Sequence, residues 1–281
     1  MKIIIRTLFF SFSFIFSLTP VTFSQINIVD YEITVDTLSL EYEYICENDT
    51  QELVPATLHV NFIYPTSTVN PDLTVYLQSF FIANCFGDDY IIYHPDDVLN
   101  YFTEDFESAV IEMENMFMED FGDERGSDFC NNNRMESIIE NSILFNTGNI
   151  LTYIVNNYQY TGGAHGMTYN TAYVIDLEKM EALSYDDLFI PGSETALSSL
   201  LKQKLILDKK AKNEKGLKEI GYYPEAIIPN NNFIVNDKGI TFIFGQYEIG
   251  PYVLGITEIT LPYKEIKKYL LKNSAILTLI P

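Results

Sequence analysis

The stretch Ser137–Tyr160, SIIENSILFNTGNILTYIVNNYQY, contains two apolar segments joined by the turn Asn146-Thr147-Gly148-Asn149. Apolar and β-branched residues on both sides of an Asn/Gly turn are typical of a β-hairpin. The later segment Thr168–Asp176 has the same character and predicts the next strand beside the hairpin. Strands that follow one another through short turns favour antiparallel pairing, so the sequence predicts an antiparallel sheet here.

Upstream of the hairpin, the sequence predicts two strands and then two helices. Asn27–Tyr44 and Thr57–Tyr64 alternate between apolar and polar residues, as strands do. Asn70-Pro71-Asp72 and Pro95-Asp96-Asp97 are typical helix starts, because proline fits the first turn and acidic side chains favour the positive end of the dipole. The second helix should pack on a sheet through apolar residues at spacings of three and four: Leu99, Phe102, Phe106, Val110, Met113 and Phe117.

Downstream of the hairpin, helices and strands again occur in groups. A helix is predicted at Thr195–Leu207, followed by an exposed Lys-rich helix or loop that reaches Lys218. Because the elements are grouped and do not alternate one by one, we predict an α+β fold, a mainly antiparallel sheet with helices packed on one face. The remaining predictions are strands at Asn231–Val235, Ile240–Phe244 and Val253–Leu261 and a closing helix at Tyr263–Leu270.

The first 24 residues are expected to be a signal peptide. Lys2 and Arg6 form a basic start, Thr7–Leu18 is apolar, and small residues precede a predicted cleavage after Ser24. No second apolar run of about 18 residues follows, so no membrane span is expected in the mature chain. We therefore expect an exported protein, periplasmic or extracellular, with an acidic α+β part at 25–152 and a second α+β part at 153–281. The two parts are expected to share one core or to pack closely.

The charge of the chain is strongly negative and unevenly distributed. The net charge is −22 and the pI is near 4.3. Gln25–Glu178 contains 27 acidic residues and only two basic ones, whereas the rest of the chain to Pro281 has 12 acidic and 13 basic residues. Nucleic acid is excluded as a natural partner because phosphate binding needs clustered Lys and Arg. The negative part would attract cationic proteins, although solubility alone also explains such acidity.

Three cysteines, Cys46, Cys85 and Cys130, allow one disulfide and one remaining thiol in an oxidising compartment. The sequence leaves all three pairings open; Cys85–Cys130 is favoured because these residues bracket the predicted central helix. No CxxC or HxxxH spacing occurs, and His59, His94 and His165 lie far apart in the sequence. We therefore expect no metal site and no cofactor.

The Gly-rich segment Tyr160-Thr161-Gly162-Gly163-Ala164-His165-Gly166 lies between two predicted strands. A phosphate-binding loop would be followed by a helix, and a strand follows here, so a nucleotide site is excluded. His165 could act as a general base, but no nucleophile or carboxylate partner can be assigned. A tight turn whose histidine hydrogen-bonds to a neighbouring strand is the favoured interpretation, and no catalytic residue is assigned. The candidate binding residues are Tyr160, Gly162, Gly163 and His165.

A second candidate segment, Gln246-Tyr247-Glu248-Ile249-Gly250-Pro251-Tyr252, also joins two predicted strands. Tyr247 and Tyr252 around a Gly-Pro turn could form an aromatic surface that binds a protein or a sugar, with Glu248 as an acceptor. A corner braced by tyrosines and without a ligand is an equal alternative. Glu248 could also serve as an acid or base, but no second carboxylate for glycosidase chemistry can be named.

The two candidate segments also carry a family resemblance. Gly162–Gly166, Asn170, Asp176-Leu177 and Leu183–Phe189, followed by Phe233, Gly239–Phe244, Tyr247–Tyr252 and Gly255, resemble in order the RsiV-like extracytoplasmic domain family. The resemblance extends from Tyr153 to about Leu270. It implies an α+β domain of largely unknown function, found in an anti-sigma factor that binds lysozyme and beside the catalytic domain of peptidoglycan deacetylases.

The resemblance implies an exported, non-enzymatic binding module of the cell envelope. A lysozyme-like cationic protein or peptidoglycan would be the partner. The chain departs from those family members because it has no transmembrane helix, sigma-binding segment or deacetylase domain that we recognise. The alternatives are an envelope hydrolase that uses His165 with Glu248 or a nearby Asp as acid and base, and a structural partner in a larger exported complex.

Overall fold

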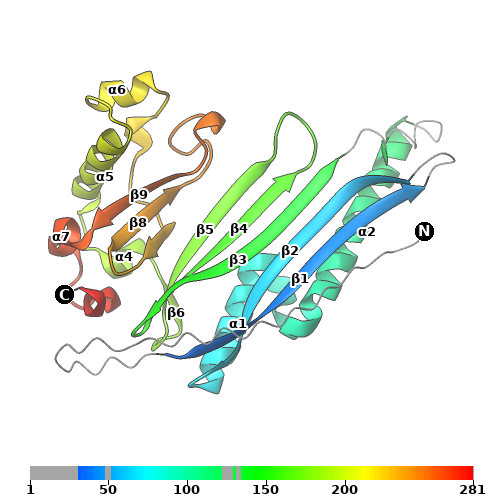
Figure 1. Ribbon diagram of the computed structural model, residues 1–281, viewed down its shortest axis with the longest axis horizontal. Coiled ribbons are helices and arrows are strands. Elements are labelled where there is room, and N and C mark those ends of the chain that lie inside the picture. The colour runs from blue at the N-terminus through cyan, green and yellow to red at the C-terminus, as the bar shows by residue number, and fades with distance from the viewer. Residues whose placement is uncertain (1–30, 48–51, 122–128, 131–133, 281) are drawn as a thin grey trace. The chain divides into compact units, whose positions relative to one another are not determined.

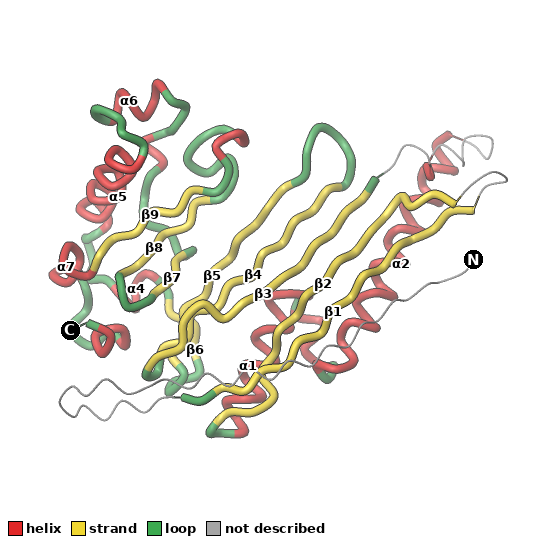
Figure 2. The backbone as a smooth tube through the Cα atoms, in the orientation of Figure 1, coloured by secondary structure: helices red, strands yellow, loops and turns green. Residues whose placement is uncertain are grey.

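The computed structural model describes residues 31–47, 52–121, 129–130 and 134–280, so the predicted signal peptide lies outside the described residues. The described strands form two sheets, a six-stranded sheet in the order β1-β2-β3-β4-β5-β6 and a three-stranded sheet in the order β7-β8-β9 (Figures 1 and 2). The predicted α+β fold with a mainly antiparallel sheet is confirmed. None of the helices in the described residues is long and apolar enough to cross a membrane.

The chain divides into two compact units. Within the described residues, the first unit comprises Ile33–Asn141 and Asn156–Thr168, and the second comprises Ser142–Val155 and the chain from Tyr169. The strands β3 (Met135–Thr147), β4 (Ile150–Tyr160) and β5 (Met167–Asp176) therefore contribute residues to both units. These three strands confirm the predicted hairpin and the strand after it.

In the first unit, two long strands pair and two helices cover one face of them (Figure 1). Its further elements are β1 (Ile33–Glu47), β2 (Glu52–Thr68), α1 (Pro71–Phe86), the 3-10 helix η1 (Asp88–Ile92) and α2 (Pro95–Phe121). As predicted, Asn70 caps α1 by accepting a hydrogen bond from the backbone N of Asp72 at 2.9 Å. Alternate residues of β2, such as Leu58 and Phe62, are fully buried, which confirms the period-two pattern.

The pairing of β2 with β3 is parallel and was not predicted. It is possible because the chain leaves β2, passes through α1 and α2, and returns to the sheet in the same direction. After the pair Asn61↔Glu140, the side chain of Asn141 continues the hydrogen bonding. Its Oδ1 accepts from the backbone N of Ile63 at 2.7 Å, and its Nδ2 donates to the Ile63 carbonyl at 2.8 Å.

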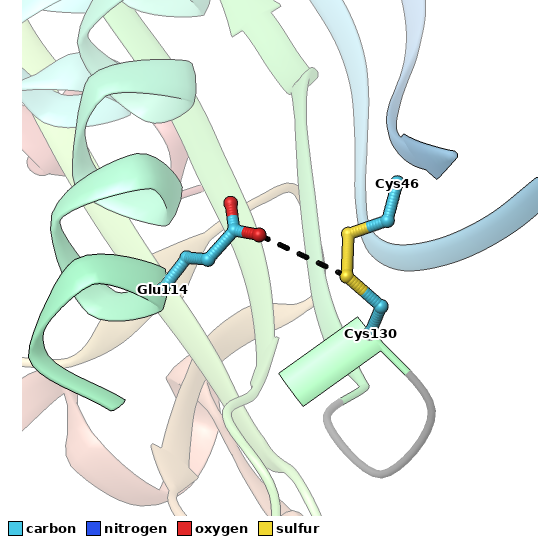
Figure 3. Close-up of side chains that lie close together, drawn as sticks. All are labelled: Cys46, Glu114 and Cys130. Atoms are coloured by element: carbon cyan, nitrogen blue, oxygen red, sulfur yellow. Dashed lines mark hydrogen bonds between the residues drawn. A yellow bond between two sulfur atoms is a disulfide. The ribbon is translucent and has the colours of Figure 1, made fainter. Parts of the chain in front are cut away.

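The disulfide of the chain joins Cys46 at the end of β1 to Cys130, so the expected Cys85–Cys130 pairing is wrong (Figure 3). Cys85 is buried within α1 and is not part of the bridge. The prediction relied on Cys85 and Cys130 bracketing the central helix. In the structure, β1 instead brings Cys46 close to Cys130, with 6.0 Å between their Cα atoms. Cys46, Cys130 and Glu114 also form the group of metal-ligand side chains found among the described residues, but two of its three ligand atoms are the disulfide sulfurs.

The second unit packs short strands and helices around a large apolar core, with a smaller buried cluster at Ile154, Ala172 and Ile243. The predicted strand Val253–Leu261 begins only at Thr257, because Tyr252–Leu254 forms a 3-10 turn. The predicted closing helix divides into α7 and a 3-10 helix, and β6 and α4 were not predicted. The elements of this unit are β6 (Glu181–Leu183), α4 (Tyr185–Leu188), α5 (Glu194–Asp208), α6 (Glu214–Glu219), η3 (Pro224–Ala226), β7 (Phe233–Val235), β8 (Gly239–Phe244), η4 (Tyr252–Leu254), β9 (Thr257–Pro262), α7 (Tyr263–Ile266), η5 (Lys267–Tyr269) and η6 (Ala275–Leu279).

Candidate functional site

The Gly-rich segment forms the loop between β4 and β5 in the first unit. Gly162 and Gly163 have φ values of +98° and +89°, so these positions require the conformational freedom that glycine provides. The Tyr160 hydroxyl donates to the Gly163 carbonyl at 2.9 Å and braces the loop. Gly166 is buried, and a Cβ at this position would lie 2.5 Å from the ring of Tyr158. The loop is therefore a turn braced by tyrosines.

His165 is exposed at this loop. Its Nδ1 lies 3.3 Å from the carbonyl oxygen of Gly166, the next residue. This contact lies within the loop itself, so the hydrogen bond of His165 to a neighbouring strand stays a prediction. An exposed histidine at a turn can also contact a ligand.

The second candidate segment forms a turn after β8, which we call the tyrosine turn (Gly245–Leu254). Glu248 holds this turn through both carboxylate oxygens. Oε2 accepts from the backbone N of Gly245 at 2.7 Å, and Oε1 accepts from Nδ2 of Asn230 at 2.9 Å. Tyr247 has a φ of +67°, a conformation that is unfavourable for a residue other than glycine. Glu248 thus positions the tyrosine that precedes it.

The tyrosine turn presents apolar and aromatic side chains to solvent. Tyr247 is 52% exposed, Val253 is 84% exposed, and the centroids of the Tyr247 and Tyr252 rings are 5.7 Å apart. Tyr223, 46% exposed, lies beside the turn and donates its backbone N–H to the Ile249 carbonyl at 2.8 Å. Exposed aromatic groups on a rigid support are typical of binding surfaces, because little conformational entropy is lost when they bind.

The structure of the turn also explains its Gly-Pro sequence. A Cβ on Gly250 would lie 2.5 Å from Cδ1 of Leu254 and 3.2 Å from the carbonyl oxygen of Gly221. The turn therefore packs closely on the chain segment that leads to Tyr223. A larger residue here would require Leu254 to move and would crowd the Gly221 carbonyl, so the exposed side chains rest on a closely packed base.

Three consecutive asparagines that the sequence analysis did not single out support this region. Asn230 bonds Glu248, Asn231 accepts from the backbone N of Tyr185 at 2.7 Å, and Asn232 binds the edge of β5. The Asn232 side chain accepts from the Ala172 N–H at 2.8 Å and donates to the Asn170 carbonyl at 2.7 Å. A run of three asparagines before a strand was the available signal, because Asn side chains commonly bond backbone groups.

The structure places the predicted site residues in two groups. Tyr160, Gly162, Gly163 and His165 belong to the first unit, and Tyr247, Glu248 and Tyr252 belong to the second. We expected both segments to meet because they would lie at strand ends of one sheet. That premise is wrong, because the Gly-rich loop joins strands of the six-stranded sheet and the tyrosine turn follows β8 of the three-stranded sheet.

Two family profiles match parts of the chain. A profile described as a protein of unknown function, DUF3298, matches residues 186–264. A profile described as deacetylase PdaC matches residues 58–168. The first match contains the tyrosine turn, and the second contains the Gly-rich loop.

Solved structures with this fold are known. A member of the DUF3298 family from Bacteroides fragilis is 32% identical, with a TM-score of 0.80, over 88% of this chain and 97% of that chain. A DUF3298 protein from Pseudomonas aeruginosa shares the fold at 16% identity, with a TM-score of 0.57, over 89% of this chain and 97% of its own.

Among curated proteins, two matches are partial. The esterase Rv3036c of Mycobacterium tuberculosis is 27% identical over 117 residues, 39% of this chain. The peptidoglycan-N-acetylmuramic acid deacetylase PdaC of Bacillus subtilis is 28% identical over 143 residues, 50% of this chain. The matched regions cover 47% of the esterase and 29% of the deacetylase, so this chain spans less than half the length of either relative.

Proposed function

The chain belongs to the DUF3298 family of proteins of unknown function, and we propose that it is a non-enzymatic binding module of the cell envelope. The tyrosine turn carries this proposal. It combines exposed apolar side chains, Tyr247 and Val253, with a base that Glu248 and Gly250 hold in one conformation. A surface of this kind suits contact with a macromolecule.

A lysozyme-like cationic protein is the proposed partner, and peptidoglycan is the other partner considered. The region Gln25–Glu178, with 27 acidic and two basic residues, would raise the rate of association with a basic protein. The resemblance to the RsiV-like domains supports the same partner. The relative named as a peptidoglycan deacetylase supports a location outside the cytoplasm, periplasmic or extracellular.

The alternative, a hydrolase in which His165 and Glu248 act as acid and base, has less support. Two relatives are an esterase and a deacetylase, which favours it. Against it, both carboxylate oxygens of Glu248 accept hydrogen bonds that hold the turn. If the alternative were correct, His165→Ala would abolish turnover of peptidoglycan by a protein that still folds. We expect no turnover that depends on His165.

The proposal is tested by titrating the purified protein into lysozyme and following tryptophan emission. This chain has no Trp, so any change reports lysozyme alone. Tyr247→Ala should weaken binding by about tenfold or more, because exposed tyrosines on rigid supports often dominate an interface. Tyr169→Ala is the matched control, because Tyr169 in β5 is 50% exposed. Equal affinity of the two variants, or no binding by the wild type, would overturn the proposal.

A further inference from the structure

An exposed apolar corner lies in the first unit, where η1 leads into α2. We call it the Ile92 corner and define it by Ile91, Ile92, Tyr93 and Tyr101. Ile92 is 78% exposed, Ile91 45% and Tyr101 41%. The rings of Tyr93 and Tyr101 are stacked, with centroids 3.8 Å apart and planes 15° from parallel. Exposed apolar side chains that lie together in this way mark a candidate contact surface.

Ring contacts and hydrogen bonds of Tyr90 and Tyr93 hold the corner in place. The ring of Tyr90 contacts those of Phe86 and Phe102, at centroid distances of 6.4 and 5.4 Å. Its hydroxyl donates to the carboxylate of Asp105 at 2.5 Å. The backbone N of Tyr93 donates to the Tyr90 carbonyl at 3.1 Å, which closes the turn into α2. These contacts hold the exposed side chains in place before a partner binds.

Acidic residues are frequent on the elements that form the corner. The exposed acidic residues on η1 and the first turns of α2 are Asp88, Asp89, Asp96, Asp97, Glu104 and Asp105. Asp96 accepts from the Tyr64 hydroxyl and Asp105 from the Tyr90 hydroxyl. Residues 31–121 contain no Lys or Arg, so no basic side chain of this stretch can pair with them. The histidine at the start of α2, His94, lies 3.4 Å from Asp96. The corner therefore combines apolar contact area with a stretch of chain that is rich in carboxylates and contains no Lys or Arg.

We propose that the Ile92 corner binds an arginine-bearing face of a cationic protein. A guanidinium group can lie over the Tyr101 ring while pairing with carboxylates, and Ile92 supplies apolar contact. An anionic membrane or an anionic wall polymer would be repelled by the same carboxylates. This inference rests on the proposed function, because it adds a second contact surface for a cationic partner. It is independent of the tyrosine turn, which lies in the other unit.

The test uses labelled deca-arginine and deca-lysine peptides as probes of the full chain. Deca-arginine should bind about threefold to tenfold more tightly than deca-lysine, because guanidinium groups stack on aromatic rings better than ammonium groups do. The double variant Ile92→Ser/Tyr101→Ala should lose this preference and bind deca-arginine about tenfold more weakly. The control Val75→Ser, at a 61% exposed position on α1, should bind as the wild type does.

A second control tests whether deca-arginine binds at the corner or is attracted by the overall negative charge of the chain. Asp88→Asn/Asp89→Asn and Glu119→Gln/Asp120→Asn remove the same charge, at the corner and near the far end of α2. The first pair should weaken deca-arginine binding more than the second. Equal loss in both pairs, or an unchanged affinity of the Ile92→Ser/Tyr101→Ala variant, would overturn the inference.

The same variants titrated into lysozyme separate this inference from the proposed function. If the wild type and Val75→Ser bind lysozyme and the corner variant binds it more weakly, both proposals are supported. If the corner variant binds lysozyme and deca-arginine as the wild type does while Tyr247→Ala binds lysozyme weakly, only the corner is refuted. If no form binds lysozyme but the peptide results hold, the proposed function is refuted and the corner is not.

Discussion

Glu248 has a side chain that could bind a ligand, but in this structure it stabilises its own turn. Its carboxylate accepts from the backbone of its own turn and from Asn230. The sequence predicted the exposed turn correctly, but it suggested Glu248 as an acceptor for a ligand. The structural role was hidden because Asn230 lies 18 residues away and the bonds leave no periodic pattern.

Removal of this carboxylate should loosen the turn. Glu248→Ala deletes two hydrogen bonds, and we expect the free energy of unfolding to fall by about 1–2 kcal/mol, because exposure of the site limits the loss. Urea denaturation measures the change. Glu258→Ala, an exposed position on β9, is the control and should be neutral. A Glu248→Ala variant as stable as the control would contradict the structural role.

Substitutions of Tyr247 should separate its effect on stability from its effect on binding. Because its φ is +67°, Tyr247→Gly should be more stable than Tyr247→Ala by up to about 1 kcal/mol. Both variants should lose binding to lysozyme, because both lack the ring. Thermal unfolding and the emission titration together check this. A Gly variant less stable than the Ala variant would show that the strain assigned to this position is absent.

At the scale of elements, individual helices and strands with a regular sequence pattern were predictable. The way in which the strands pair with one another was not. Alternation predicted β2 and the β3–β4 hairpin, and helical spacing with a capping signal predicted α1 and α2. The parallel pairing of β2 with β3 depends on how the intervening helices return the chain, and no local pattern records that. Similarly, β6 and α4, with three and four residues, are too short to produce a periodic signal.

For the candidate site too, the local segments were predictable and the contacts between distant residues were not. The Gly-rich loop and the tyrosine turn were located from residue type, and the positive φ values of Gly162 and Gly163 followed from their chemistry. The asparagines Asn230, Asn231 and Asn232 were missed because their partners lie on other elements. The disulfide pairing was wrong for the same reason, since β1 brings Cys46 to Cys130 across 84 residues.

The disulfide should stabilise the first unit substantially. A bridge that closes a segment of 84 residues is worth up to about 4 kcal/mol through the entropy of the unfolded chain. We expect a dithiol reductant to lower the stability of the wild type and of Cys85→Ala by similar amounts. The stability of Cys46→Ser should not change on reduction. A peptide map without reduction should recover Cys46 joined to Cys130, and a Cys85 bridge would contradict the structure.

Tyrosines of the first unit should make it sensitive to alkali. Burial, and then Glu107, raise the pKa of Tyr42 to about 12. Burial raises the pKa of Tyr44, Tyr64 and Tyr90 further, assisted by their hydrogen bonds to Glu114, Asp96 and Asp105. A raised pKa means that the folded state favours the neutral phenol. The stabilisation is therefore complete below about pH 10 and is lost as the pH rises through about 12 and beyond.

Absorbance of tyrosinate and circular dichroism, recorded together against pH, test this expectation. The buried phenols should ionise only as the fold is lost, in one coupled transition. Tyr44→Phe should make the stability less dependent on pH in this range, because one linked proton is removed. Ionisation of all tyrosines near pH 10 with the fold intact would contradict the account.

At the scale of the whole chain, charge is segregated along the sequence. From Gln25 to Glu178 the net charge is −25, and from Lys179 onward it is +1. A partner attracted by the first region would be held by a field that salt weakens. Apolar contact at the tyrosine turn would be much less sensitive to salt, so the two contributions can be separated by ionic strength.

The central claim, that the chain binds a cationic protein, is tested most directly by titrating it with lysozyme at low and physiological salt while following tryptophan emission and cell-wall lysis. We predict saturable binding, loss of lysis, and affinity that falls by about tenfold as salt rises from 20 to 150 mM. Binding that does not respond to salt, or no binding at either concentration, would contradict the claim.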